Sequence, residues 1–350
     1  MRIIKSIFGI SFAVIIMALS SGQALANSGT SLSISPPTNV VTTKPNSSVS
    51  VPIKVENNGS SPIVLRVSLM KFGAYGTSGK ALLTKFKPSD TYAKWVTFSK
   101  TNLTANPGVW ETDIMTINVP ASAMPSYYYA VLFTPVSSAS VSGNGASLNG
   151  SITSLVLLNV VSSHEKRQLK VVSFTSSKWI YEYLPASFSV KVKNTGNTFI
   201  APSGAIYISK NKVNDIATLN INPNQGNILS DSERVYKADW SNGFPVFLSK
   251  KGANGKAITS NGQVVKQLSW NWSNLSKFRF GHYYAHLTLV YNNGVQDIQI
   301  QGNVSFWVIP WKILLVVIFL IALIVWGIYS LIRSRRRIKR LESSLKLRRH

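Results

Sequence analysis

Alternation of apolar and polar residues is the dominant pattern of this chain. Every second residue is apolar over residues 49–55 and again over 63–69, and the four residues Glu-Asn-Asn-Gly follow the first run. Because successive side chains of a strand point to opposite faces of a sheet, each run predicts a strand with one buried face. The turn-forming residues between the runs favour a β-hairpin.

The same pattern recurs further along the chain. Additional strands are predicted at residues 95–98, 113–119, 127–133, 152–161 and 169–174, separated by clusters of Gly, Ser, Asn and Pro. Residues 188–192 lead through Asn-Thr-Gly-Asn into 205–208, which repeats the strand, turn, strand order of 49–69. Short strands at this density indicate β-sandwiches.

One strand shows which of its faces is buried. Within residues 278–291 one set of alternate positions is apolar or aromatic, and it is expected to face the core. Its members are Tyr283, Ala285, Leu287, Leu289 and Tyr291.

The predicted fold class is all-β, with two immunoglobulin-like β-sandwich domains and one C-terminal transmembrane helix. The first domain is placed at residues 31–163 and the second at 168–306, with a long insert at 241–277 that is poor in clear strands. Residues 137–150 are predicted to form a long Ser/Gly/Asn-rich loop.

The N-terminal end has the pattern of an export signal. Arg2 and Lys5 precede an apolar run, and Ala24-Leu25-Ala26 is the small-x-small pattern that a signal peptidase recognises. We therefore expect residues 1–26 to be a cleaved signal peptide.

The C-terminal end has the pattern of a membrane anchor. Residues 313–332 carry no charge and, as a helix, are long enough to cross a bilayer. The basic tail at 333–350 predicts a cytoplasmic C-terminus and extracellular domains on a single-pass plasma membrane protein. The residues expected to hold the anchor at the two membrane surfaces are Trp311, Lys312, Arg333, Arg335, Arg336 and Arg337.

Charge narrows the range of partners. The chain has 37 Lys and Arg against 12 Asp and Glu, and 25 cations against 11 acids remain when the signal, Lys312 and the tail are left aside. A basic body outside the membrane favours a lipid bilayer, peptidoglycan or an anionic wall polymer as partners, and nucleic acid is not expected. The chain contains no cysteine, which excludes thiolate chemistry and favours a bacterial origin.

Candidate catalytic groups are few. Glu111 and Asp113 lie two residues apart on a predicted strand, but so basic a chain favours solvated partners of lysine over a catalytic pair. His282 and His286 are too far apart on a strand to share a metal. Asp231-Ser232-Glu233 lacks the spacing of a calcium loop. No catalytic, cofactor-binding or metal site is predicted.

Aromatic residues offer a binding surface instead. Trp270 and Trp272 would point the same way in an extended segment and are the candidate residues for stacking on a ligand such as a sugar. Trp179, Tyr181 and Tyr183 form a second row of the same kind, although burial in the core is the commoner fate of such rows.

Four segments carry a resemblance to a known family. They are SVPIKVENNGSSPIVLRVSL at 50–69, FSVKVKNTGNTFIAPSGAIYI at 188–208, ILSDSERVYKADW at 228–240 and GHYYAHLTLVY at 281–291. In this order the chain resembles the WxL-interacting cell-surface proteins, in which paired immunoglobulin-like domains precede a membrane anchor. That family's first domain is thought to bind peptidoglycan and its second a host or partner protein, so the resemblance implies adhesion or wall-associated scaffolding, with no catalytic residues.

The sequence therefore predicts a membrane-anchored cell-surface binding or scaffolding protein that recognises wall glycan or a surface protein. The alternative is a chaperone-like assembly factor for exported proteins that donates a strand, because residues 152–161 are apolar on both faces. A glycan hydrolase using Glu111 and Asp113 is a distant third.

Overall fold

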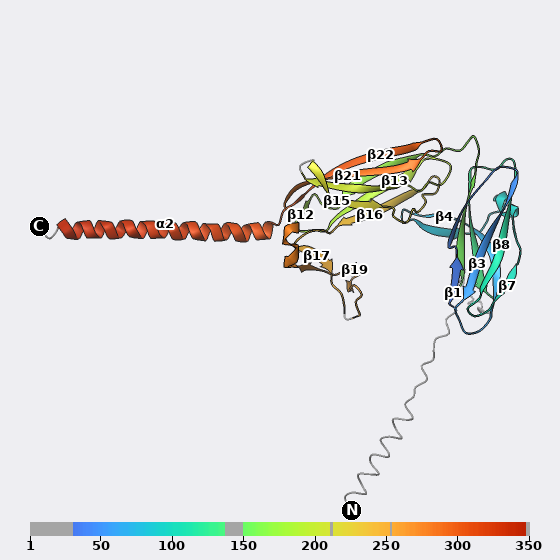
Figure 1. The fold of residues 1–350 in the computed structure, drawn as a ribbon, viewed down its shortest axis with the longest axis horizontal. Coiled ribbons are helices and arrows are strands. Elements are labelled where there is room, and N and C mark those ends of the chain that lie inside the picture. The colour runs from blue at the N-terminus through green and yellow to red at the C-terminus, as the bar shows by residue number, and fades with distance from the viewer. Residues whose placement is uncertain (1–30, 137–149, 211–212, 253, 348–350) are drawn as a thin grey trace, which may run out of the picture. The chain divides into compact units, whose positions relative to one another are not determined.

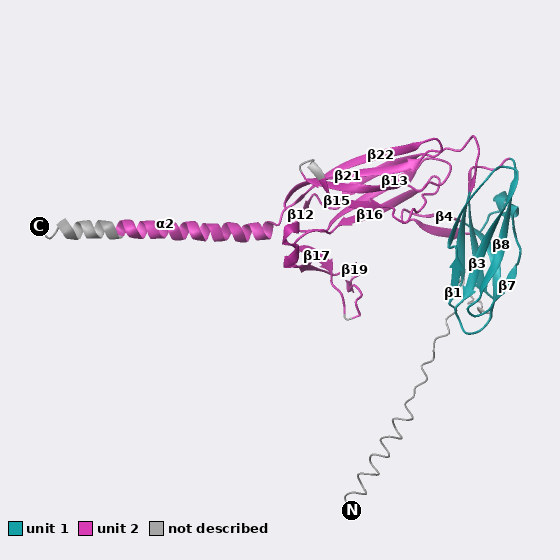
Figure 2. Ribbon diagram, viewed as in Figure 1, with its two compact units in different colours: residues 1–71, 85–121, 128–158 teal, residues 72–84, 122–127, 159–350 magenta. Residues whose placement is uncertain are grey.

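The computed structural model describes residues 31–136, 150–210, 213–252 and 254–347, with side chains described up to residue 337. The predicted signal peptide and nearly all of the predicted loop at 137–150 lie outside the described residues. Figure 1 shows the strands gathered into β-rich bodies, followed by one long helix. The chain divides into two compact units, of which the second consists of residues 72–84, 122–127 and 159–350 (Figure 2).

The first sandwich has two sheets. One has the strand order β1 (Leu32–Ser35), β3 (Ser47–Asn57), β8 (Trp110–Val119), β6 (Val96–Phe98). The other has the order β2 (Thr38–Thr43), β10 (Ile152–Val160), β9 (Ser126–Pro135), β4 (Ile63–Tyr75), β5 (Lys80–Thr84), and β7 (Asn102–Ala105) also pairs with β4. A short 3₁₀-helix, η1 (Thr91–Trp95), precedes β6.

The second sandwich also has two sheets. One has the order β11 (Leu169–Ser176), β13 (Ala186–Asn194), β16 (Glu233–Trp240). The other has the order β12 (Ile180–Tyr181), β22 (Asp297–Val308), β21 (Gly281–Asn292), β14 (Ser203–Lys210), β15 (Val213–Ile221). The all-β, immunoglobulin-like class is thereby confirmed. The five residues of β21 that were predicted to face the core are all buried.

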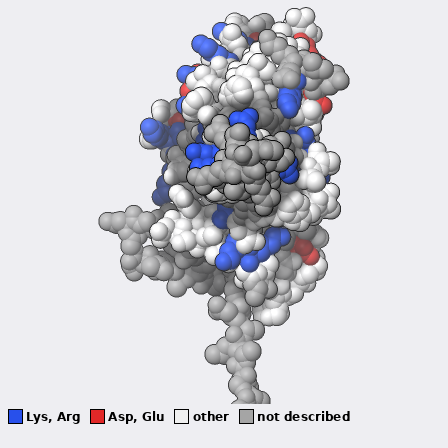
Figure 3. Space-filling model, turned by 90° about the vertical axis from the view of Figure 1, so that its left-hand side faces the viewer, with Lys and Arg blue, Asp and Glu red and all other residues white. Residues whose placement is uncertain are grey.

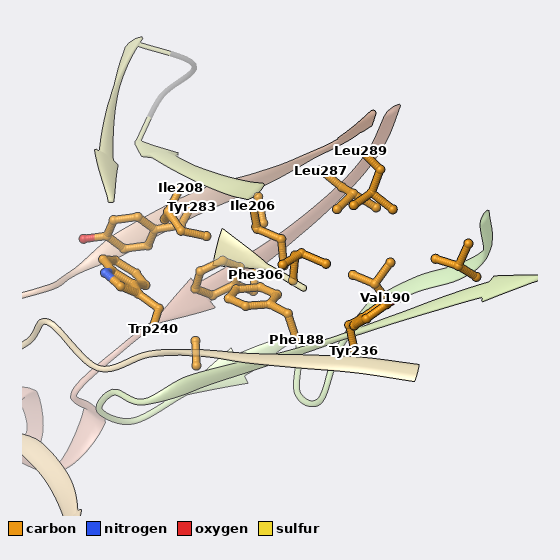
Figure 4. Packing of buried hydrophobic residues seen from close by; sticks show 14 of the residues in the cluster. Phe188, Val190, Ile206, Ile208, Tyr236, Trp240, Tyr283, Leu287, Leu289 and Phe306 are labelled. Carbon is orange, nitrogen blue, oxygen red and sulfur yellow. The ribbon is translucent and has the colours of Figure 1, made fainter. Parts of the chain in front are cut away.

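An aromatic cluster lies in the second core around the C-terminal end of β22 (Figure 4). Phe306 of β22 lies at its centre, with ring centroids 5.3 Å from Phe188 and 5.8 Å from Tyr283. The rings of Tyr181 and Trp240 lie at 5.7 and 6.0 Å from Phe306. These rings come from both sheets, so the cluster holds the two layers together through large buried apolar areas and edge-to-face contacts.

The predicted hairpin at 49–69 is wrong in its pairing, although both strands exist. β3 belongs to one sheet and β4 to the other, so residues 58–62 connect the two layers. The same holds for β13 and β14 in the second sandwich. Alternation identifies the buried face of each strand, but two strands whose apolar faces meet across a core have the same pattern as two neighbours in one sheet.

A buried asparagine stabilises each of these connections. Nδ2 of Asn57 donates to the carbonyl oxygens of Ser61 and Ala105, and Oδ1 of Asn57 accepts from the amide of Gly59. Asn194 makes the equivalent bonds in the second sandwich, with the carbonyls of Thr198 and Ile228 and the amide two residues on. Strands that leave for different sheets do not bond each other, so the side chain supplies the missing backbone partners.

The insert is more ordered than predicted. β17 (Val246–Ser249) pairs with β20 (Lys266–Ser269), β18 (Thr259–Ser260) pairs with β19 (Gln263–Val264), and the 3₁₀-helix η2 (Trp272–Lys277) follows. These strands have two to four residues, too few for alternation to be visible in a segment rich in Ser, Asn, Gly and Lys.

The C-terminal helix, α2 (Trp311–Leu347), is longer than the predicted span of 313–332. Its stretch Trp311–Arg337 contains a window with a mean hydropathy of 2.9, none of which is buried in the protein. The helix is long and apolar enough to cross a membrane, and it continues into the basic residues of the predicted tail.

Replacing Asn194 with alanine is expected to lower the free energy of unfolding by about 2 kcal/mol, because three buried hydrogen bonds are lost, although the carbonyl of Ile228 keeps its bond from the amide of Ile200. Denaturant unfolding of the full chain in detergent micelles, followed by tryptophan fluorescence, measures this change. Asn118, which is exposed on β8, is the matched control, and an equal loss in Asn118→Ala would contradict the explanation.

Candidate functional site

The two carboxylates of β8, Glu111 and Asp113, make contacts that are typical of structural residues. Asp113 is 1% exposed, and its Oδ1 accepts hydrogen bonds from Ser99 Oγ at 2.6 Å and from the amide of Lys100 at 3.0 Å. Glu111 lies 3.7 Å from the Lys100 ammonium. The expectation of solvated lysine partners is therefore met by Glu111 and wrong for Asp113, which is buried because it fastens residues 99–100 to β8.

The other polar candidates are also engaged separately. The ring of His282 stacks on Trp307 with centroids 4.6 Å apart, whereas Nδ1 of His286 lies 2.7 Å from Asn303 Oδ1. The Lys191 ammonium, 2.9 Å from Glu233, holds the pKa of that carboxyl below its usual value. Within the described part of the chain, no three His, Asp or Glu residues are grouped to hold a metal ion.

Strand β10, predicted to be a donor of backbone pairing, is not at a sheet edge. Within the described residues it lies between β2 and β9, and most of its side chains are buried. The edges of this sheet are instead β2 and β5, and β2 is a strand that the sequence patterns do not predict. Its six residues stand between Pro36-Pro37 and Lys44-Pro45, and prolines on both sides hid a run rich in β-branched residues.

Strand β2 leaves one side of its backbone unpaired by other strands of the described chain. The carbonyl oxygen of Pro37 accepts from the amide of Leu155 at 3.0 Å, so alternate residues from Pro37 onward direct their backbone groups toward β10. Val40 therefore directs its amide and carbonyl to the open side, and its side chain is 57% exposed.

Trp270 and Trp272 do lie together, as predicted, but not on an extended strand. Their rings stack with centroids 5.9 Å apart and an angle of 29° between planes, at the point where β20 ends and η2 begins. The Phe244 ring lies 5.2 Å from Trp272 and 5.9 Å from Trp270. Trp270 is 43% exposed and Trp272 67% exposed, so the pair is accessible from outside.

The second aromatic row is not a surface. Tyr181 and Tyr183 are buried, and Trp179 alone of the three is exposed. The hydroxyl of Tyr181 is hydrogen-bonded within the 176–187 turn region, 2.8 Å from Ser176 Oγ. Burial raises the pKa of the Tyr183 phenol.

The residues predicted to anchor the chain stand at the start and near the end of the apolar part of α2. The Lys312 ammonium lies 3.1 Å from Oε2 of Glu182 and 5.3 Å from the centre of the Trp311 ring. Arg333, Arg335, Arg336 and Arg337 are exposed on the continuing helix. In Figure 3, blue Lys and Arg side chains outnumber red Asp and Glu on the face viewed.

Comparison with known proteins gives distant structural similarity only. No family model matches the sequence, and no curated protein matches it. The class 5 fimbriae chaperone CfaA is 13% identical, with 80% of this chain and 100% of that chain covered at a TM-score of 0.35. The CsuC–CsuE chaperone–tip adhesion subunit complex of Acinetobacter baumannii is 12% identical, with 77% and 97% covered at 0.33. The E. coli chaperone DraB is 10% identical, with 79% and 98% covered at 0.32. At these values no function or residue role is transferred.

Replacing Asp113 with alanine is expected to lower the free energy of unfolding by about 2–3 kcal/mol, because Ser99 and Lys100 lose a buried acceptor. Glu111→Gln is expected to change it by less than about 1 kcal/mol, since its ion pair with Lys100 is long and partly exposed. Urea unfolding of the two variants in micelles checks both values. Turnover of a glycan that Glu111→Gln abolishes would instead support the hydrolase hypothesis.

Proposed function

We propose that this chain is a membrane-anchored, non-catalytic binding protein that captures an extended segment of an exported protein along the open edge of β2. In this proposal α2 crosses the plasma membrane, the β-sandwiches lie outside and the basic end of α2 lies in the cytoplasm. Membership of the WxL-interacting family stays a prediction, as does the cleaved signal peptide.

The anchoring part rests on α2 and its flanking charges. The apolar window of α2, with a mean hydropathy of 2.9 and no burial against the protein, needs an apolar environment around it. The arginines from Arg333 to Arg337 follow the apolar stretch, and such clusters remain on the cytoplasmic side. Aromatic Trp311 at the other end suits the headgroup level.

The open edge of β2 is the observation that supports the binding part of this proposal. Edge strands usually bear lysine, proline or a bulge that prevents pairing with other chains. β2 has the sequence TNVVTT, with no charge, no proline and an exposed Val40. An extended peptide that adds to such an edge gains main-chain hydrogen bonds and places alternate side chains against the sheet.

The other edge of the same sheet, β5, has the sequence KALLT, in which Leu82 is exposed but Lys80 adds a charge of the kind that hinders pairing. Several further edges of the described sheets are short, irregular or already engaged. β1, β6 and β12 have four, three and two residues. β11 contains a register irregularity between Val171 and Ser173, and β15 shows two such irregularities against β14. On β16 the amide of Val235 already donates to the carbonyl of Thr77 at 2.9 Å.

Val40→Pro is expected to abolish capture of exported proteins by the full-length chain, because proline removes the backbone donor that Val40 directs to the open edge. Val40→Lys is expected to weaken capture, and Val172→Lys on β11 is its matched control at an exposed valine of another edge. The measurement is quantitative recovery of co-purifying exported proteins from detergent extracts. Equal recovery with all variants, each confirmed to be folded, would contradict the proposal.

Wall-polymer binding is the second candidate, favoured by the excess of cations in the exported part of the sequence. It predicts that purified peptidoglycan with its attached polymers retains the chain, and that retention falls steeply as salt rises past about 0.1 M, where the Debye length is near 10 Å. Sedimentation across a salt series measures this. Retention that does not respond to salt, or no retention, would remove this candidate.

A further inference from the structure

The insert of the second sandwich, taken with the three residues that follow it, has an unusual composition for a surface segment. Residues 241–280 contain six Lys or Arg, six aromatic residues and no Asp or Glu. Several of its large apolar side chains are exposed by two fifths or more. They are Leu248, Trp270, Trp272, Leu275, Phe278 and Phe280, and we call these residues, with Lys250, Lys251, Lys256 and Lys266, the aromatic–basic face.

The chain passes from the core of the second sandwich into α2 without a linker. Phe306 and Val308 of β22 are each 1% exposed, and the amide of Ile309 donates to the carbonyl of Tyr181 at 2.8 Å. α2 begins two residues later at Trp311. If α2 crosses a bilayer, this end of the sandwich therefore lies at the membrane surface, because no flexible segment separates the two.

The insert reaches along the first turns of α2. A groove of about 540 Å³ is lined by Phe247, Leu268 and Trp270 of the insert and, on its other wall, by Val316 and Val317 of α2. With a rise of about 1.5 Å per residue, Val317 lies about 9 Å along the helix from Trp311. The interfacial layer on each side of a bilayer's hydrocarbon core is about 5–8 Å thick, so, with Trp311 at the headgroup level, the insert side chains beside Val316 and Val317 reach through this layer to the edge of the hydrocarbon core.

The two stacked tryptophans lie at this groove. Trp272 stacks on Trp270, which itself lines the groove beside α2. Indole rings favour the boundary between headgroups and acyl chains, and lysines without neighbouring carboxylates favour anionic headgroups.

We propose that the aromatic–basic face docks on the outer surface of the bilayer that α2 crosses, with Trp270 and Trp272 in the interfacial layer and the insert lysines on anionic lipid headgroups. This inference rests on the proposed anchoring by α2. The second sandwich would then be attached to the membrane in two ways, by α2, which continues its chain, and by the aromatic–basic face, which binds the lipid surface.

Because the chain has no cysteine, one cysteine introduced by mutation can be labelled selectively in the full-length protein. A polarity-sensitive fluorophore is attached to Leu275→Cys on the face, to Ile324→Cys in the middle of the apolar stretch of α2, or to Val295→Cys. Val295 is 91% exposed at the β21–β22 turn, and the register of the hairpin puts this turn about 11 residues, or roughly 36 Å, from Val308.

Each labelled chain is reconstituted into vesicles of phosphatidylcholine with or without about 30% phosphatidylglycerol, and quenching by aqueous iodide is measured. The Leu275 label is expected to be quenched roughly fivefold less with the anionic lipid than without it, while Val295 stays fully quenched and Ile324 stays protected. Changing four lysines of the face, Lys250, Lys251, Lys256 and Lys266, to glutamine is expected to remove this protection. The matched control neutralises Lys54, Lys85, Lys170 and Lys237, which are exposed elsewhere, and is expected to keep it.

The three labels distinguish a chain that is anchored but not docked from a chain that is not anchored. Protection of Ile324 with full quenching of Leu275 in both lipid mixtures would overturn the docking and leave the anchor standing. Quenching of all three labels would overturn the anchor. Protection of Leu275 by a soluble anionic wall polymer, in vesicles where anionic lipid gives none, would assign the face to the polymer and overturn lipid docking.

Discussion

Burial of Phe306 between the two sheets of the second sandwich is the interaction on which the placement of α2 depends. Complete burial of a phenylalanine contributes about 2–3 kcal/mol, and each well-placed aromatic pair adds about 0.5–1.5 kcal/mol. Phe306 packs on Phe188 and Tyr283, and Val308 is buried two residues later. Freeing β22 would lose these contacts together, so the last residues before α2 behave as part of the sandwich.

The two sandwiches solve the same local problem in the same way. Each sends consecutive strands into different sheets, and each places an asparagine with no exposure at the connection. Asn57 and Asn194 both donate twice to carbonyls and accept from an amide two residues on. An apolar side chain of similar size would remove all three of these hydrogen bonds, which explains why a polar residue stands at this buried position of each connection.

Sequence patterns are sufficient to predict a feature that depends on a single physical requirement, such as burial of one face of a strand. Alternation in β21 reports burial on one face, and the structure confirms it at every position. Alternation says nothing about which strand is the neighbour, so the connection after β3 was misassigned as a hairpin. The prolines on both sides of β2 hide this strand from a reading of the pattern. The burial of Asp113 depends on its hydrogen bonds from Ser99 and Lys100, which are tertiary contacts that the sequence does not reveal. The closeness of Trp270 and Trp272 was anticipated, whereas their position beside α2 required the fold.

The edge of β2 and the aromatic–basic face use different forces, so one chain can hold two partners without competition between them. Pairing along Val40 depends on backbone hydrogen bonds of an uncharged strand, which salt changes little. Docking through the lysines of the insert is Coulombic and is screened within about 10 Å at 0.1 M salt. The aromatic rings oppose complete release, because their transfer from the interface into water is unfavourable at any ionic strength. Raising the salt concentration should therefore loosen the second sandwich from the lipid surface before it affects a strand bound at β2.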